Sequence, residues 1–437
     1  FGLESMKLTA NSSPDECLKL APASCQGGAG GNRLPINGSY SSDEYFVEAA
    51  MPLLSGVFLA ENIDLELGYR NADYDVQGST DSWKAGISWE VVSGFRLRVM
   101  LQEAVRVANV GELFRPTTTA LDNATFDPCS VGNPNPPAPG SELFNRCVST
   151  GMLPSQVGTV PDIISGQINI FQGTNFDALP KPEEAETFTV GFVWETPFEW
   201  FPAVISLDYY DIEITDYIDQ PSGQESLDTC YVIGDPVCLA GVVRIGGALG
   251  ETGTGVPAFY TNFERYQAEG IDLVVSTGFE LGGIGSLDLS WNAHQYLTNE
   301  FLTTPLSAVV DCKGVYGTSC DPVPEFRSTI RALWMLNDFD ASILWRHIGS
   351  MDAQANEADA LFEAFRSVDS QNYFDLTFGY TWNETVRFSL MIANVTDEDP
   401  PILGNETGST AFNSGNTFPS MFDTMGRVYN AAVKLSF

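Results

Sequence analysis

The sequence predicts an all-β protein built as an antiparallel transmembrane β-barrel. Three observations lead to this prediction. Thirteen segments alternate apolar and polar residues with the period of a β-strand. These segments are about 10–24 residues long, whereas strands of globular proteins usually have about 5–6 residues. The connections between them are short and long in turn, which is typical of barrels whose two rims face different compartments.

Composition narrows the class of protein further. The 437 residues include 21 Lys and Arg against 57 Asp and Glu, so the net charge is −36. This charge repels phosphate and argues against a nucleic-acid partner. Hydrophobic residues make up 43% of the chain and aromatic residues 12%, which is too apolar for a disordered protein. No run reaches the roughly 18 apolar residues that a membrane-spanning helix requires.

The strand pattern is clear where Ile63, Leu65 and Leu67 alternate with Asp64 and Glu66. A tilted membrane strand needs about 9–11 residues in lipid, so segments of this length can cross a bilayer. The thirteen predicted strands lie near residues 40–54, 61–73, 79–91, 94–110, 183–196, 202–218, 258–281, 284–298, 325–337, 339–349, 370–383, 385–395 and 423–437.

The predicted connections fall into two sets. Six are short, such as those at 92–94, 282–283 and 337–338. The long set consists of residues 1–39, 110–182, 219–257, 299–324, 349–370 and 396–422, with a tight exception near 74–78. Four tryptophans precede short turns, as in an aromatic girdle: Trp89, Trp194, Trp334 and Trp382. A soluble β-sandwich, the alternative fold, has shorter strands and two comparable sets of loops.

All eight cysteines lie in the long connections. None has the C-x₂-C spacing of a zinc site, and the chain has only two histidines, so we expect no metal site. Pairing between sequence neighbours is the simplest of the many possible connectivities, with free thiols as the alternative. Disulfides indicate an oxidising compartment. The expected pairs are Cys17 with Cys25, Cys129 with Cys147, Cys230 with Cys238, and Cys312 with Cys320.

Motifs along the chain resemble those of TonB-dependent outer-membrane receptors. Residues 106–116 (RVANVGELFRP) resemble the family's R-A-P-N-x-x-E-L-F signature, with Val107 and Ala108 where the family usually has Ala and Pro. Segments similar to later family strands are 179–183 (LPKPE), 187–192 (TFTVGF), 206–212 (SLDYYDI) and 269–272 (EGID). Segments similar to its closing motifs are 392–401 (IANVTDEDPP) and 426–429 (GRVY). The resemblance extends over about residues 40–437.

The resemblance implies a barrel of about 22 strands, filled by an N-terminal plug domain that carries the TonB box. The last strand runs toward the periplasm, and counting back makes the segment 40–54 strand 10. Residues 1–39 are then the end of an extracellular loop, and residues 40–437 are the C-terminal portion of the barrel. On this count the chain is a fragment, and the plug and strands 1–9 lie outside it.

The resemblance also implies a function. The protein is expected in the bacterial outer membrane with its long loops extracellular, where it takes up a scarce or bulky nutrient. Expected partners are TonB, acting through the plug, the surrounding lipid, and an unidentified small-molecule or oligomeric ligand. The barrel is expected to be monomeric and to need no cofactor. From sequence, no Ser or Cys nucleophile can be paired with His294 or His347, which argues against an enzyme.

Two other functions remain open at this stage. A passive porin-like channel requires a complete, even-stranded barrel without a plug. A surface adhesin or autotransporter barrel carries a passenger domain upstream.

Aromatic residues in the loops are the candidate ligand contacts, because their rings can stack on sugars or on aromatic chelators. Packing within the loops is the alternative for each of them. The negative charge disfavours anionic ferric siderophores, unless the plug supplies positive charge, and favours neutral oligosaccharides, peptides or cationic ligands. A salt-adapted surface that has no bearing on the ligand is the alternative explanation of this charge. Asp397, Glu398 and Asp399 have the chemistry of a Ca²⁺ site, but we interpret them as a solvated family motif. The candidate contacts are Tyr231, Phe259, Tyr260, Tyr316, Phe362, Phe365, Phe412 and Phe418.

Overall fold

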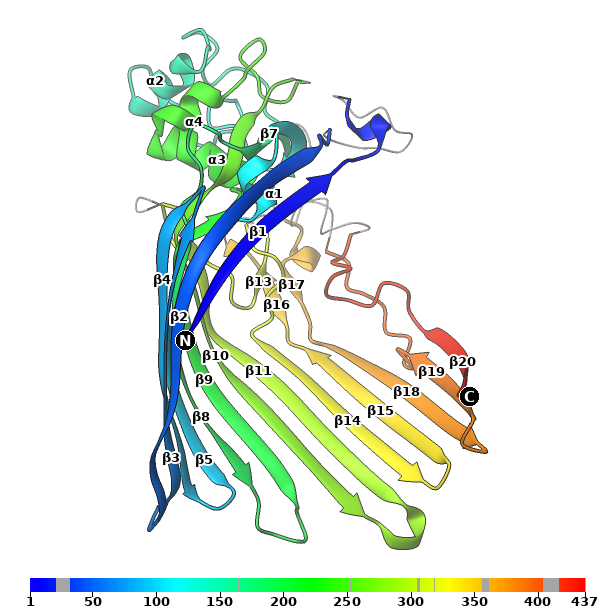
Figure 1. Ribbon diagram of the computed structural model, residues 1–437. Helices are drawn as coiled ribbons and strands as arrows, with labels where there is room; N and C mark the ends of the chain where they lie inside the picture. The colour runs from blue at the N-terminus through cyan, green and yellow to red at the C-terminus, as the bar shows by residue number, and fades with distance from the viewer. Residues whose placement is uncertain are drawn as a thin grey trace.

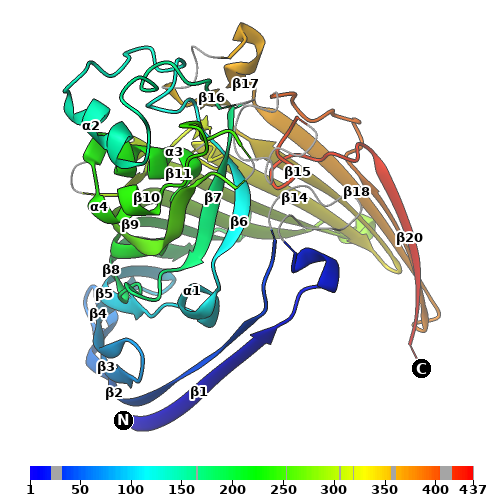
Figure 2. The same ribbon diagram turned by 90° about the horizontal axis from the view of Figure 1, so that it is seen from above.

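A single large antiparallel sheet dominates the computed structural model of this protein (Figure 1). The structure describes residues 1–20, 32–163, 166–251, 253–304, 307–317, 319–355, 361–403 and 416–436. Within these residues the sheet has 17 strands, of which β6, β7 and β12 are short additions from the loops. The others each pair with the next long strand along the chain, and Figure 2 shows that together they curve around a central space.

The long strands correspond to the thirteen predicted segments, with one strand added before them. Their bounds are β1 (Gly2–Ser12), β2 (Ile36–Val57), β3 (Ala60–Tyr74), β4 (Gly78–Val92), β5 (Phe95–Arg106), β8 (Glu183–Glu195), β9 (Ala203–Asp219), β10 (Val256–Glu280), β11 (Ser286–Leu302), β14 (Phe326–Leu336), β15 (Phe339–Ile348), β18 (Gln371–Trp382), β19 (Val386–Ala393) and β20 (Val428–Leu435).

The register gives the sheet one apolar and one polar face. One row of paired residues runs Leu97, Phe192, Leu207, Leu273 and Ala293 across β5, β8, β9, β10 and β11. The adjacent row on the other face runs Arg98, Gly191, Asp208, Asp272 and His294. Because side chains alternate along each strand, this separation persists along the sheet. We call the face of the second row the polar face.

Glycine on the polar face lets charged side chains meet across a strand. The guanidinium of Arg98 on β5 reaches Asp208 on β9, with 2.6 Å between Nη2 and Oδ2, although β8 lies between them. Gly191 of β8 lies beneath this ion pair, and a Cβ there would collide with the Asp208 carboxylate. The polar face therefore neutralises part of its charge internally.

The short turns are closed by specific contacts. Trp89 Nε1 donates to the Leu59 carbonyl at 2.8 Å, and Trp334 Nε1 donates to the Ile284 carbonyl at 2.7 Å. Each indole thus ties the end of its strand to the carbonyl of a neighbouring turn. The 3₁₀ turn η4 (Gly282–Ile284) ends at Gly285, whose φ of 92° and ψ of −154° suit glycine alone. These interactions fix the strand ends at one rim.

The opposite rim carries the long connections, which fold into a layer of helices and short strands (Figure 1). The 107–182 and 219–257 segments share a hydrophobic core that includes Ile168, Leu227 and Tyr231. The elements of the long connections are η1 (Glu16–Leu18), α1 (Val110–Phe114), β6 (Thr118–Asn123), α2 (Glu142–Ser149), β7 (Gln167–Thr174), α3 (Gly223–Leu227), the π-helix η3 (Asp228–Ile233), α4 (Pro236–Gly241), β12 (Val310–Asp311), β13 (Val315–Tyr316), β16 (Met351–Ala353), η5 (Glu363–Phe365) and β17 (Ser367–Val368).

The structure corrects one expectation about the N-terminal segment. Residues 1–39 were expected to belong to a loop, but Gly2–Ser12 form β1, which pairs with β2 over its whole length. Nearly every residue of β1 is exposed, because the strand lies at an edge of the sheet. Its sequence carries only a weak alternation of apolar and polar residues, so the period-two pattern did not reveal it.

Three further observations complete the fold. The apolar parity of the segment 202–218 changes near Tyr209, yet β9 keeps its register with both neighbours there, so no bulge causes the change. Among the described residues no pairing joins β1 to β20, which form opposite edges of the sheet in Figure 2. In the part of the chain that the structure describes, none of the helices combines the length and apolarity of a membrane span.

Candidate ligand-binding cavity

The motif at residues 106–116 forms the base of the longest loop. Arg106 at the end of β5 pairs with Glu183 at the start of β8, with 2.5 Å between Nε and Oε1. The same guanidinium contacts Glu112 of α1 at 3.0 Å. Asn109 caps α1 by accepting from the backbone amides of Gly111 and Glu112. Both ends of the loop are therefore fixed to each other and to its first helix.

Disulfides brace the layer above this base. The described residues include three of the four expected pairs: Cys129–Cys147, Cys230–Cys238 and Cys312–Cys320. Cys25 lies outside the described residues, so its pairing with Cys17 is not described. Each of the three bonds closes a loop between neighbours in the sequence.

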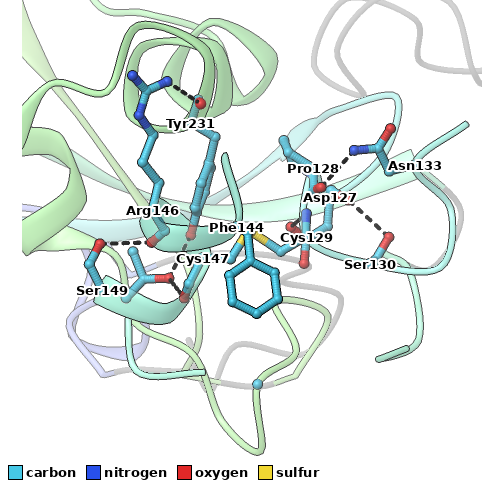
Figure 3. The surroundings of a disulfide bond; sticks show 12 residues. Asp127, Pro128, Cys129, Ser130, Asn133, Phe144, Arg146, Cys147, Ser149 and Tyr231 are labelled. Carbon is cyan, nitrogen blue, oxygen red and sulfur yellow. Dashed lines mark hydrogen bonds between the residues drawn. A yellow bond between two sulfur atoms is a disulfide. The ribbon is translucent and has the colours of Figure 1, made fainter. Parts of the chain in front are cut away.

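The interior of the loop layer contains Tyr231 (Figure 3). Arg146 donates to the Tyr231 backbone carbonyl at 2.9 Å, and the Tyr231 hydroxyl donates to Thr150 at 3.0 Å. The Arg244 guanidinium also binds the Tyr231 hydroxyl and forms a buried ion pair with Asp127 at 2.6 Å. Tyr231 therefore serves as a satisfied core residue.

A cavity of about 770 Å³ lies where this layer meets the ends of β9, β10 and β11. The volume is within the range of about 300–1,000 Å³ that is usual for ligand pockets. Its lining residues come from the sheet and from three loops: Ala120, Leu121, Asp122, Ile170, Gln172, Tyr217, Asp219, Gln220, Pro221, Ser222, Glu225, Phe263, Tyr266, Tyr296, Asn299, Phe301, Cys312, Gly317, Ser319, Asp321 and Val323.

Aromatic side chains from the strand ends form one wall of the cavity. The rings of Tyr217 and Tyr266 stack with 5.4 Å between centroids, and those of Phe263 and Phe301 stack at 6.0 Å. The Tyr266 hydroxyl accepts from Asn299 Nδ2 at 3.0 Å. Tyr266 has the same parity along β10 as Asp272, so its ring lies on the polar face of the sheet.

Four carboxylates from different segments line the rest. Asp122 of β6 accepts from the Gly223 amide at 2.9 Å, and Asp219 accepts from the Gln220 amide at 2.7 Å. Glu225 of α3 accepts from the Ser222 amide at 2.7 Å in a capping box. No hydrogen bond or ion pair to Asp321 is found within the described residues. The loops and the end of β9 thus bring four carboxylates to the lining of one cavity.

Burial perturbs these acids. Loss of solvent raises the pKa of the Glu225 carboxyl to about 7, although hydrogen bonds from Ser222 oppose the shift. Burial also raises the pKa values of Asp122 and Asp321 above their usual range. The cavity lining contains no Lys, Arg or His. An anionic surface without a resident cation is the main electrostatic feature of the site.

The cavity is not arranged to hold a metal ion through its side chains. Across the described ranges, no group of three or more His, Cys, Asp or Glu side chains comes together as a potential metal site. The Asp397 carboxylate, considered above for Ca²⁺, instead accepts from the Arg427 amide at 2.8 Å. Asn394, fully buried nearby, exchanges hydrogen bonds with the Glu398 backbone. These residues stabilise the corner before β20.

The eight predicted contact residues lie elsewhere. Tyr231, Tyr316 and Phe418 are almost fully buried in hydrophobic clusters, which leaves them no surface for a ligand. Phe259 and Tyr260 lie on β10 and are half-buried, with Arg115 over the Tyr260 ring. The remaining three are Phe362, which is exposed, Phe365, which packs edge-on against it, and Phe412, which lies outside the described residues.

Sequence reasoning missed the residues that line the cavity. Tyr217, Phe263 and Tyr266 lie within predicted strands and were not among the candidate contacts. The signal available was their position at strand ends beside long loops, where a barrel widens toward its mouth. The sequence gives no comparable signal for Asp122 and Glu225, because only the folding of two loops brings them together.

The two histidines of the chain each contact polar side chains. His294 on the polar face lies 2.7 Å from Asp272 through Nδ1 and 3.4 Å from the Tyr210 hydroxyl through Nε2. His347 Nδ1 lies 3.0 Å from the Asn372 side chain. Neither set of contacts includes a Ser or Cys side chain.

Comparison with known families and structures gives a consistent result. The family model described as TonB dependent receptor-like, beta-barrel matches residues 17–395. No curated protein matches the chain. Among solved structures, a variant of the ferric enterobactin receptor PfeA from Pseudomonas aeruginosa, in complex with enterobactin, has 13% identity and a TM-score of 0.55, covering 92% of this chain and 46% of that chain.

Two other structures are similar. The siderophore receptor PirA from Acinetobacter baumannii has 13% identity and a TM-score of 0.54, covering 93% of this chain and 47% of that chain. The copper transporter OprC has 15% identity and a TM-score of 0.50, covering 92% and 48%. At these identities the similarity concerns the fold. The chain spans about half the length of these proteins.

Proposed function

This chain belongs to the TonB-dependent receptor-like β-barrel family, and we propose that it is the loop-bearing part of a receptor for nutrient uptake across the bacterial outer membrane. In this proposal the long loops are extracellular and capture the nutrient. TonB supplies the energy by acting on a plug within the barrel. The family match over residues 17–395 is the observation that carries the proposal.

The shape of the sheet supports it. Short turns at one rim and long, disulfide-braced loops at the other suit a protein with a periplasmic and an extracellular side. The apolar face suits contact with lipid, and the polar face suits a lumen. The edges at β1 and β20 carry backbone groups that lipid cannot satisfy. We therefore propose that further strands of the native receptor complete the barrel.

The nature of the nutrient is a separate question. The similar structures include a ferric enterobactin receptor and a copper transporter, so the fold accommodates different cargoes. The similar structures give no support to a sugar cargo, and we do not retain the preference for oligosaccharides. The proposal at this level is uptake of a scarce or bulky small molecule, with binding rather than covalent chemistry at the loops.

The test is nutrient depletion by living cells. Four strains of the native bacterium, with and without this receptor and with and without TonB, are grown in the same medium, and the compounds removed from it are measured by mass spectrometry. We expect at least one compound to be depleted only by the strain that has both proteins. A fifth strain with the receptor restored on a plasmid controls for secondary effects of the deletion.

Two outcomes contradict the proposal. Depletion that requires the receptor but not TonB indicates a passive channel. The absence of any receptor-dependent depletion, under starvation for iron, copper and carbon in turn, indicates a protein without an uptake role.

A further inference from the structure

The fully buried carboxylates of the described residues are paired with arginine, whereas the carboxylates of the cavity, which are half-buried or exposed, are not. Glu44, Glu183 and Asp375 each have an ion pair with an arginine, and Asp127 pairs with the buried Arg244. By contrast, Asp122, Asp219, Glu225 and Asp321 have no ion pair with any basic side chain among the described residues. Asp122, Asp219 and Glu225 are half-buried and Asp321 is exposed, so water screens their negative charge only in part, and no basic side chain of the described residues neutralises it.

The aromatic wall defines what kind of positive charge fits. The stacked rings of Tyr217 and Tyr266, together with Tyr296, line the same cavity as the carboxylates. The π-faces of such rings attract ammonium and guanidinium groups, and their edges pack against apolar carbon. A ligand that combines a cationic group with an apolar body therefore matches both walls.

Size and spacing argue against a bare ion. A cavity of about 770 Å³ is much larger than a single cation with its first hydration shell. The four acids come from β6, the end of β9, α3 and the 312–323 loop. Among the described residues, no three His, Cys, Asp or Glu side chains come together as a potential metal site. Acids spread around a large space suit an extended cation with one or more charged groups.

We propose that this cavity binds an organic cation, an amine or guanidine carried on an apolar or aromatic body. The proposal deepens the proposed function and rests on it, since it names the ligand class that the receptor would capture. Asp219 and Asp321 provide the charge, and Tyr217, Tyr266 and Tyr296 provide the surface for the body.

The experiment uses the protein purified from outer membranes in detergent and a fluorescent probe, monodansylcadaverine, which carries a primary ammonium on an aromatic body. Its N-acetyl derivative has the same body without the charge. Binding is followed by dansyl fluorescence for the wild type and for the Asp321→Asn and Asp219→Asn variants. Asp177→Asn is the matched control, because Asp177 is an exposed loop carboxylate that does not line the cavity.

We expect the amine to bind about tenfold more tightly than its acetylated form. Each cavity variant should weaken amine binding several-fold and leave the acetylated probe unaffected, whereas Asp177→Asn should change neither. Asp321 has no described hydrogen-bond partner, so its replacement leaves the fold intact. Equal binding of the two probes, or amine binding that both cavity variants retain, overturns the proposal.

The two proposals fail in different ways. TonB-dependent depletion of a nutrient together with no charge preference in the cavity rejects the cation proposal and leaves the uptake function in place. Charge-dependent probe binding together with TonB-independent depletion supports the cation site and rejects energised uptake.

Discussion

Arg106 links the end of β5 to helix α1 and to the start of β8. Its guanidinium contacts Glu183 across the base of a loop of more than seventy residues and also holds Glu112 in α1. Both carboxylates are largely buried, whereas Arg106 is 41% exposed through its side chain. The motif residues are therefore explained by loop closure, without any contact to a ligand.

Replacing Arg106 should destabilise this base. Because Arg106→Ala leaves two shielded carboxylates without their partner, we expect a loss of about 1–3 kcal/mol in the free energy of unfolding. Urea titration of the purified protein measures it. The control is Arg96→Ala on the same strand, whose ion pair with Glu90 is long at 3.8 Å and exposed. Similar losses for both variants would contradict a special role for Arg106.

Glu225 should make stability depend on pH. Its pKa is raised to about 7 by burial, against an ordinary value of 4.5. The folded protein thus holds the proton more tightly than the unfolded chain. The stability that Glu225 contributes is full below pH 4.5 and is lost as the pH rises through about 7.

The difference between wild type and Glu225→Gln isolates this group. We expect the variant to lose the component of pH dependence between about pH 4.5 and 7 and to be the more stable protein at pH 8. Thermal unfolding at a series of pH values measures the difference. Glu251→Gln, at an exposed position, is the control and should follow the wild type. Parallel curves for wild type and Glu225→Gln would show that burial does not perturb this carboxyl.

At the scale of elements, the turn between β10 and β11 depends on one glycine. Gly285 has φ of 92° and ψ of −154°, and a Cβ there would collide with the Met335 carbonyl of β14. Gly283, two residues earlier in the same turn, faces open space. Gly285→Ala should cost about 1–3 kcal/mol in the free energy of unfolding, and Gly283→Ala should cost much less. Equal costs in urea titration would contradict the turn geometry.

The disulfide Cys312–Cys320 should hold the wall of the cavity rather than the sheet. The Cys312 amide donates to the Asn299 carbonyl of β11 at 2.8 Å. This hydrogen bond holds the loop that the disulfide closes against a strand that carries part of the aromatic wall. A Cys312→Ser/Cys320→Ser variant should show faster hydrogen exchange at residues 310–317 with unchanged exchange in β14.

The control for this variant lies in the other braced loop. Cys230→Ser/Cys238→Ser should accelerate exchange at 223–241 instead. A change that spreads equally over loops and sheet in either variant would show that the disulfides stabilise the whole molecule and not their own loops.

Strands and cavity differ in how far sequence could predict them. A sheet with an apolar and a polar face imposes alternation on its long strands, which is why the thirteen long strands from β2 onward were found from periodicity. The strand β1 carries only a weak alternation in its sequence and was missed. In the loops, aromatic residues also form cores, so the sequence could not separate ligand contact from loop packing for Tyr231 and Tyr316, which are buried. The acids of the cavity meet only after three loops have folded.

At the scale of the whole molecule, the curved sheet and its loop layer differ in how their charged groups are arranged. The strands provide a rigid wall with neutralised charge pairs such as Arg98–Asp208, whereas the carboxylates that line the cavity at the loop rim have no ion pair among the described residues. The net charge of −36 adds a long-range attraction for cations. This division depends on the loops facing the medium from which the ligand comes.

The orientation of the sheet is therefore the most direct measurement. A short epitope tag is inserted after Asp177, in the exposed loop between β7 and β8, or after Gly283, in the turn between β10 and β11. Antibody labelling is then compared between intact cells and cells with a permeabilised outer membrane. We predict that intact cells label only at Asp177 and that the tag at Gly283 becomes accessible only after permeabilisation. Labelling of the Gly283 tag on intact cells, with the Asp177 tag hidden, would contradict a receptor whose cavity opens to the outside.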